Sequence, residues 1–230
     1  MSGVGLTPPA PGTRHPTPLM PSPVITITRQ YGSGGSAVAK RAADALGWTL
    51  IDNEFVEEVA RRAGLPAEEV AQREERAPGL LERLTRTLAV SSPELFITAA
   101  SVPQVEADEE TIAKITERVI QEAAAHGRAV LVGRGAQALL AQRPDALHVY
   151  VIAPRDFRIK LAIERLGVDP AKAEKVLDDT DRQRDQYVKA NYGRHRQDPV
   201  NYDMVLNTGR LGLEGAAELI VAEVRRRGWK

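Results

Sequence analysis

The sequence contains no cysteine in its 230 residues, which excludes disulfides, thiolate catalysis and cysteine metal sites. Its formal net charge is zero, so no overall field attracts nucleic acid or an anionic membrane. Aromatic residues make up only 4%, too few for a surface that stacks single-stranded nucleic acid. There is no run of about 18 apolar residues, and no basic segment followed by an apolar core near the N-terminus. We therefore expect no membrane span, no signal peptide and a cytoplasmic location.

The clearest functional signal is a glycine-rich turn between two regular segments. A β-branched run at 24–28 favours an extended strand, and after the turn apolar residues recur at helical spacing until Gly47. The turn itself consists of Gly32, Ser33, Gly34, Gly35 and Ser36. A strand, a glycine loop and a helix in this order place backbone N–H groups and a helix N-terminus around a phosphate. We therefore predict a phosphate site here, the alternative being a flexible connector.

The turn matches the phosphate-loop pattern G-x-x-x-x-G-K-[ST] only in part. Gly34 takes the second glycine position and Ser36 the Ser/Thr position. Arg29 stands where the first glycine belongs, and Gly35 where the lysine belongs. That lysine normally offsets charge during phosphoryl transfer. Two nearby cations are candidates to replace it, namely Arg29 at the end of the strand and Lys40, about 6 Å beyond Ser36 along the helix axis.

The rest of the chain alternates strands and helices, with two exceptions. Residues 1–23 carry repeated prolines among small polar residues and are predicted to be a disordered tail, with a role as a proline-rich ligand as the alternative. Residues 65–105 are predicted to form a charged helical insertion over one end of the sheet. Further strands are predicted at 48–51, 129–132, 147–152 and 202–206, and the later helices at 108–126, 157–166, 169–185 and 214–227.

These segments predict one α/β domain at 24–230, a doubly wound parallel five-stranded sheet with helices on both faces. Ligands of such sheets bind at the carboxyl ends of the strands. Arg29, Asp52, Gly133 and Asn207 lie at the ends of predicted strands, so we expect them to meet at that edge. Asp52 is there either to bind a ligand or to cap the helix that follows it.

At this point the sequence resembles the cytidylate kinase-like proteins among the nucleoside-monophosphate kinases. The likeness rests on residues 25–35, 51–52, 132–134 and 201–208, and covers about residues 24–226. It implies a sheet of the P-loop kinase type. It also implies that the protein transfers the γ-phosphoryl group of ATP to a nucleoside monophosphate with Mg²⁺, so that its partners are nucleotide substrates.

The resemblance further implies roles for single residues. The loop 32–36 would hold the ATP phosphates, with Ser36 near Mg²⁺, and the turn at Asn207 and Thr208 would lie beside the adenine. Asp52 would begin the monophosphate-binding part. Arg134 would face the monophosphate, although the acidic residue expected after it is replaced by Gly135.

A lid-like helical segment is expected at about 155–195. The resemblance places Arg182, Arg184 and Asp185 there, in the part that brings cations over both phosphates. Arginine suits this task because its planar fork binds two phosphate oxygens at once. The candidate catalytic cations are therefore Arg29, Lys40, Arg134, Arg182 and Arg184, and Asp185 is a candidate substrate ligand together with Asp52.

Three functions remain open from the sequence. The first is an active nucleoside-monophosphate kinase, with CMP or dCMP favoured by resemblance. The second is a nucleotide-binding regulatory domain that has lost efficient catalysis, because the loop lysine and the acidic residue after Arg134 are missing. The third is a phosphotransferase of the same fold that acts on another hydroxyl or phosphate acceptor.

Overall fold

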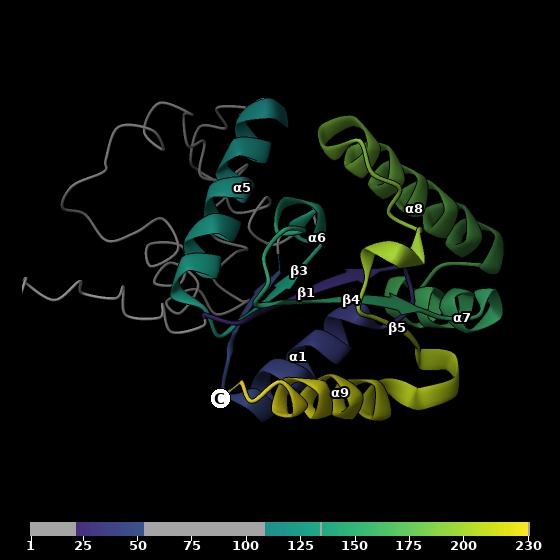
Figure 1. Cartoon of the computed structure of the whole chain (residues 1–230). Coiled ribbons are helices and arrows are strands. Elements are labelled where there is room, and N and C mark those ends of the chain that lie inside the picture. The colour runs from purple at the N-terminus through teal and green to yellow at the C-terminus, as the bar shows by residue number, and fades with distance from the viewer. Residues whose placement is uncertain (1–21, 53–108, 134, 230) are drawn as a thin grey trace, which may run out of the picture.

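The computed structural model of the chain describes residues 22–52, 109–133 and 135–229 (Figure 1). The helical insertion predicted at 65–105, almost all of the predicted tail, and Arg134 lie outside these ranges. The domain boundaries given above therefore stay predictions.

Five strands form one parallel sheet in the order β2-β3-β1-β4-β5. They are β1 (Val24–Arg29), β2 (Thr49–Asp52), β3 (Ala129–Val132), β4 (Ala146–Ile152) and β5 (Met204–Asn207). The predicted α/β sheet is thus confirmed, with strand boundaries shifted by a residue or two. The central strand β1 pairs with β3 on one side and with β4 on the other, and β2 and β5 form the two edges of the sheet.

The described helices are α1 (Gly35–Leu46), α5 (Glu109–His126), α6 (Ala136–Leu139), α7 (Arg155–Leu166), α8 (Pro170–Tyr192) and α9 (Thr208–Arg226), with a short 3₁₀ turn η2 (Pro199–Asn201). Two boundaries differ clearly from the prediction. Helix α8 continues to Tyr192 instead of ending at residue 185. Helix α9 begins at Thr208 instead of 214, because the segment before the break at Gly212 is already helical.

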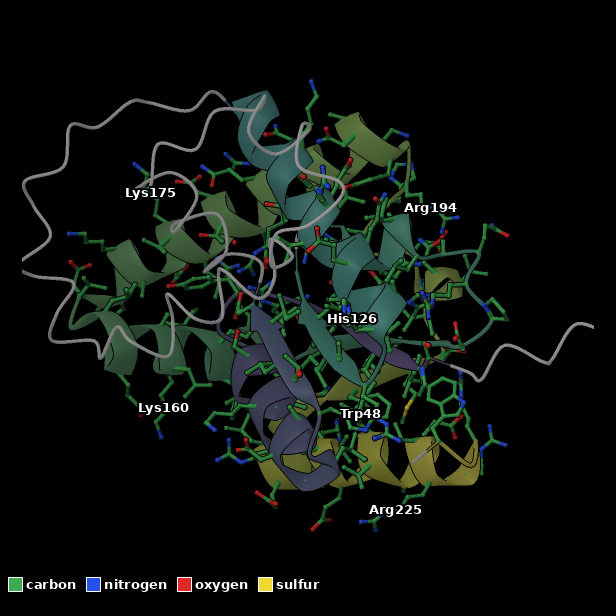
Figure 2. All side chains as sticks on the ribbon, turned by 90° about the vertical axis from the view of Figure 1, so that its left-hand side faces the viewer. Trp48, His126, Lys160, Lys175, Arg194 and Arg225 are labelled. Carbon is green, nitrogen blue, oxygen red and sulfur yellow. The ribbon has the colours of Figure 1, made fainter. Side chains whose placement is uncertain are left out.

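Alternating side chains along the strands divide the core into two layers. Ile25 and Ile27 of β1 pack with α1 and α9 on one face, whereas Val24 packs with α5 and α6 on the other. Figure 1 shows the same arrangement, with α1 and α9 below the sheet and α5 and α6 above it. In Figure 2, Lys160 and Lys175 extend outward from α7 and α8, which are the helices outside these two layers.

Helices α7 and α8 pack against each other near the carboxyl ends of the strands (Figure 1). Helix α8 starts there because Pro170 occupies its first turn and the Asp169 side chain accepts a hydrogen bond from the Lys172 N–H. The strand register brings Arg29 of β1, Asp52 of β2 and Asn207 of β5 to the same edge. The fold therefore collects the predicted site residues at the edge that α7 and α8 cover.

Candidate functional site

The glycine turn between β1 and α1 has the backbone conformation of a phosphate-binding loop. Gly32 and Gly34 adopt left-handed φ angles of 74° and 75°, which glycine accepts without strain. Gly34 is the N-cap of α1 and provides no side-chain cap. The first N–H groups of α1 have no intrahelical acceptor, and no acidic residue occupies the first turn. An anion at this helix end would be favoured by both the N–H groups and the helix dipole.

Close neighbours explain why these loop positions are glycines. A Cβ at Gly32 would lie 2.5 Å from the backbone oxygen of Arg158 in α7, and one at Gly34 would overlap the side chain of Leu213 in α9. The turn is therefore a fixed part of the fold, and the flexible-connector reading is not supported. Ser36 is nevertheless exposed, so the helix end is open to solvent.

Ser33 and Thr208 hold the turn against β4. The buried Ser33 hydroxyl donates to the carbonyl oxygens of Gln30 at 2.8 Å and Val151 at 3.2 Å. The Thr208 hydroxyl, also buried, donates to the Ser33 carbonyl at 2.7 Å. Asn207 caps α9 by accepting from the Gly209 N–H at 3.1 Å. Asn207 and Thr208 were predicted to lie beside the adenine. In the structure, Thr208 anchors the loop and Asn207 caps the start of α9.

A chain of polar contacts joins Ser36 to Arg29 through Asp52. The Ser36 hydroxyl donates to Asp52 Oδ2 at 3.2 Å, and Arg29 Nη2 lies 3.6 Å from Asp52 Oδ1. Arg29 is buried, with 5% of its surface exposed. The sheet edge therefore brings Arg29, Ser36 and Asp52 together, as the sequence analysis expected.

Lys40 lies apart from this group. Its ammonium nitrogen is 2.8 Å from Asp44 Oδ2, one helical turn further from the loop, and both side chains are well exposed. Of the two candidate replacements for the loop lysine, the structure favours Arg29.

A pocket of about 390 Å³ opens beside Arg29. Its wall combines β1, the β3–α6 turn, α8 and the segment before β5, with Thr28, Arg29, Gly133, Gln137, Arg184, Tyr187 and Arg196 among its lining residues. The charged side chains among the described lining residues are all arginines, and no carboxylate is among them. Such a wall favours an anionic ligand.

Gln137 gives this pocket one oriented hydrogen-bonding group. Its side chain is 6% exposed, and Nε2 donates to the Asn201 carbonyl at 2.8 Å. A carbonyl only accepts hydrogen bonds, so the amide orientation is fixed and the other polar atom, Oε1, is an acceptor. Gln137 therefore keeps Oε1 as an acceptor and its second N–H as a donor.

A network of arginines and aspartates connects α8 to the loop. It consists of Arg158, Arg184, Arg196, Asp181 and Asp185, and is called the arginine network below. The Asp181 carboxylate accepts from the Tyr31 N–H at 2.9 Å and from Arg158 Nη1 at 2.6 Å. Arg196 donates to Asp185 Oδ1 at 2.6 Å and to the Arg29 carbonyl at 2.8 Å. The residues that lead into the turn are thereby tied to α8, Tyr31 through Asp181 and Arg29 through Arg196 and Asp185.

Burial and charge act in opposite directions on this network. Burial disfavours the charged form of Arg196, but Tyr150, Asp185 and Asp181 outweigh it and raise the pKa of the guanidinium above its usual value. Burial raises the pKa of Tyr202, whose hydroxyl donates to the Arg196 carbonyl at 2.6 Å, to about 12. Arg196 is therefore charged and Tyr202 neutral at physiological pH.

The residues predicted on α8 fall in different places. Arg184 lines the pocket and lies 3.4 Å from the Arg29 carbonyl. Asp185 holds Arg196 and Gln197. Arg182 faces solvent, with 65% of its side chain exposed, and pairs with Asp179. Arg158 and Arg196 were not among the predicted site residues, yet they are 8% and 5% exposed.

Family comparison agrees with this arrangement. The profile of the cytidylate kinase-like family matches residues 24–210, which include the loop, the pocket and all of α8. The chain belongs to the cytidylate kinase-like family.

Individual relatives are distant. An uncharacterized protein from Eubacterium ventriosum superposes with a TM-score of 0.63 at 21% identity, covering 88% of this chain and 98% of that one. A shikimate kinase from Bacteroides thetaiotaomicron superposes at 0.50 with 13% identity, covering 88% and 98%. These two likenesses concern the fold alone, which this chain shares with a shikimate kinase. The uronate isomerase of Corynebacterium glutamicum is 29% identical over 116 residues, which are 50% of this chain and 22% of that protein. The chain thus spans about a fifth of that relative's length.

In this cytidylate kinase-like protein, the position of the acidic residue expected after Arg134 has no room for a side chain. Gly135 has a left-handed φ of 70°, and a Cβ there would overlap the ring of Tyr192. The Tyr192 hydroxyl donates to Glu117 Oε1 at 2.8 Å, which links the end of α8 to α5. Tyr192 therefore occupies the space that a side chain at residue 135 would need.

Two further features are absent from the described part of the protein. None of the helices in residues 22–52, 109–133 and 135–229 has the length and apolar character needed to cross a bilayer. In the same ranges no three His, Cys, Asp or Glu side chains are grouped so as to hold a metal ion.

Proposed function

We propose that this protein transfers the γ-phosphoryl group of ATP to a nucleoside monophosphate, with CMP or dCMP as the preferred acceptor. The observation that carries the proposal is the position of Arg29. Its side chain lines the pocket and also contacts Asp52, which accepts from Ser36 at the end of the phosphate loop. One cation therefore lies between a site for the donor phosphates and a cationic pocket for the acceptor.

Two features of the site fit ATP and Mg²⁺. The first N–H groups of α1 have no side-chain cap and no acidic residue in the first turn, so they are available to phosphate oxygens. Ser36 and Asp52 offer a hydroxyl and a carboxylate, the oxygen ligands that Mg²⁺ prefers, and they would hold the ion. The ion would neutralise charge on the donor phosphates.

The reaction needs positioning and little else. An acceptor phosphate oxygen forms a bond to the γ-phosphorus, while the bond from the γ-phosphorus to the β–γ bridging oxygen breaks. ADP leaves with that electron pair, and the products are ADP and a nucleoside diphosphate. Because the attacking phosphate oxygen carries no proton at neutral pH, no general base is needed. Arg29 and Arg184 would bind the acceptor phosphate and the transferred group from the pocket side.

The oriented amide of Gln137 supports a base with an exocyclic amine. Oε1 accepts a hydrogen bond, which suits the amine of cytosine and not the carbonyl oxygen of uracil at the same place. This is a second argument for a cytidine-type acceptor, independent of the family likeness.

The test is an acceptor screen with the full chain. Mg-ATP is incubated with CMP, dCMP, UMP, AMP, GMP and, as a small hydroxy acid, shikimate, and ADP is measured by chromatography. We expect ADP formation that depends on CMP or dCMP. ADP formation with shikimate alone would show that the acceptor is a small hydroxy acid and not a nucleoside monophosphate.

A second candidate is a nucleotide-binding regulatory domain with weak or no catalysis. The absence of a loop lysine favours it, as does the orientation of Lys40 toward Asp44. Binding of Mg-ATP in a calorimeter without ADP formation with any acceptor would support this function against the first.

A further inference from the structure

The two departures from the phosphate-loop pattern are in contact. A Cβ built on Gly35 would lie 2.5 Å from the Cβ of Arg29 and 3.0 Å from its Cγ, whereas real Cβ contacts essentially never fall below 3.0 Å. Gly35 has no left-handed φ and starts a helix, so backbone conformation does not require glycine there. The stem of Arg29 is what excludes a side chain at residue 35.

The rest of the Arg29 side chain returns to the site from the strand side. Its guanidinium passes over Gly133, where a Cβ would overlap Nη1, and continues to Asp52. It ends at the pocket wall, one contact away from Ser36. The Arg29 stem thus lies against Gly35 at the start of α1, while its guanidinium lies against Gly133 and is linked to Ser36 through Asp52.

We propose that Arg29 and Gly35 are an exchanged pair. The usual pattern has glycine at the first position and the lysine cation at the seventh, and this loop has the cation at the first and glycine at the seventh. Arg29 is then the cation that contacts the donor phosphates. It extends from the end of β1, whereas the usual lysine extends from the start of α1. This inference rests on the proposed phosphate site, and it names which residue supplies the charge and why the lysine is missing.

The steric half of the proposal is testable without any nucleotide. Gly35→Ala is made in the wild-type chain and in an Arg29→Gly chain, and thermal unfolding is followed by circular dichroism. We expect Gly35→Ala to lower Tm by several degrees in the wild-type chain, and to leave Tm unchanged or raise it once the Arg29 stem is absent. Equal shifts in the two chains would overturn the exchange.

The electrostatic half is tested by binding and turnover. Mg-ATP affinity is measured by calorimetry for the wild type and for Arg29→Gly, Gly35→Lys, Arg29→Lys and the double variant Arg29→Gly/Gly35→Lys. We expect each of the first two single variants to lose at least tenfold in affinity, and the double variant to regain most of it. Arg29→Lys, which keeps the stem and a charge, should retain more affinity than Arg29→Gly and serves if Arg29→Gly does not fold. Arg41→Gln, at an exposed arginine of α1 paired with Glu214, is the control and should bind like the wild type.

The outcomes separate the two proposals. Unchanged ATP affinity in both Arg29 variants, or no ATP binding by the wild type, overturns the exchange. ATP binding that follows the pattern above without phosphoryl transfer to any acceptor supports the exchange and contradicts the proposed kinase activity.

Discussion

The phosphate loop and the arginine network lie at the same edge of the sheet but are built in opposite ways. The loop works through main chain, since glycines at 32 and 34 remove side chains where Arg158 and Leu213 approach. The arginine network works through long side chains held by Asp181 and Asp185. A site made of main chain is visible in the sequence because its glycine spacing is its signature. A site made of arginines is not visible in the sequence, because nothing in the residue type indicates which arginine is buried.

The largest effect is expected where a buried member of the arginine network is removed. Arg196→Gln deletes a 5% exposed cation and leaves Asp185 and Asp181 without its charge. Breaking a buried pair from one side costs about 3 kcal/mol or more of unfolding free energy. The control is Arg155→Gln, which removes a half-exposed arginine of α7 paired with Asp178 of α8 and should cost clearly less. Urea denaturation measures both, and equal losses would show that burial does not distinguish the two arginines.

A smaller effect is expected from the loop, where strain and clash can be separated. Gly32→Ala must adopt a φ of 74° and also place a Cβ 2.5 Å from the Arg158 oxygen. Gly47→Ala adopts a φ of 66°, and among the described residues no atom lies within 4 Å of its Cβ. We expect about 1 kcal/mol of destabilisation at Gly47 from φ alone and about 2 kcal/mol at Gly32. Mg-ATP binding should be lost only with Gly32→Ala, and binding that survives it would contradict a main-chain phosphate site.

The contrast between the two regions also explains what the sequence predicted. The strands and most helices followed from apolar periodicity, because each element buries one face against the sheet. The meeting of Arg29, Ser36 and Asp52 followed from the rule that parallel strands end at one edge. The burial of Arg158 and Arg196 did not, because it depends on α8 extending to Tyr192 and on the segment after it returning to the sheet. Helix α8 carries Glu174, Asp178, Asp181 and Asp185 at helical spacing, and each of them pairs with an arginine. This acidic stripe was the signal in the sequence that could have predicted buried arginines beside α8.

The pocket offers a third comparison, between an oriented amide and an exposed one. Gln137→Leu removes the fixed acceptor, so the preference for CMP over UMP should fall by at least tenfold, about 1.4 kcal/mol. Gln186 also lines the pocket but is exposed, and Gln186→Leu should leave that preference nearly unchanged. The ratio of kcat/KM for the two acceptors is the measurement. A preference that persists in Gln137→Leu would assign base selection to another group.

The smallest effect is expected far from both regions, at a buried histidine in the sheet. His148 is 8% exposed, and its Nδ1 lies 2.7 Å from the Thr26 hydroxyl. Burial lowers its pKa below the ordinary value of 6.5, against the opposing charge of Asp203 and with the help of Arg194 and Arg227. The unfolded chain therefore binds more protons than the folded one below about pH 6.5, so stability falls as the pH drops through that value.

Unfolding free energy, measured by urea denaturation, should fall more between pH 7.5 and pH 5.5 in the wild type than in His148→Gln. The control His126→Gln, at an exposed histidine of α5, should keep the wild-type pH dependence. If His148→Gln retained the full wild-type dependence, His148 would not be the source of the acid sensitivity.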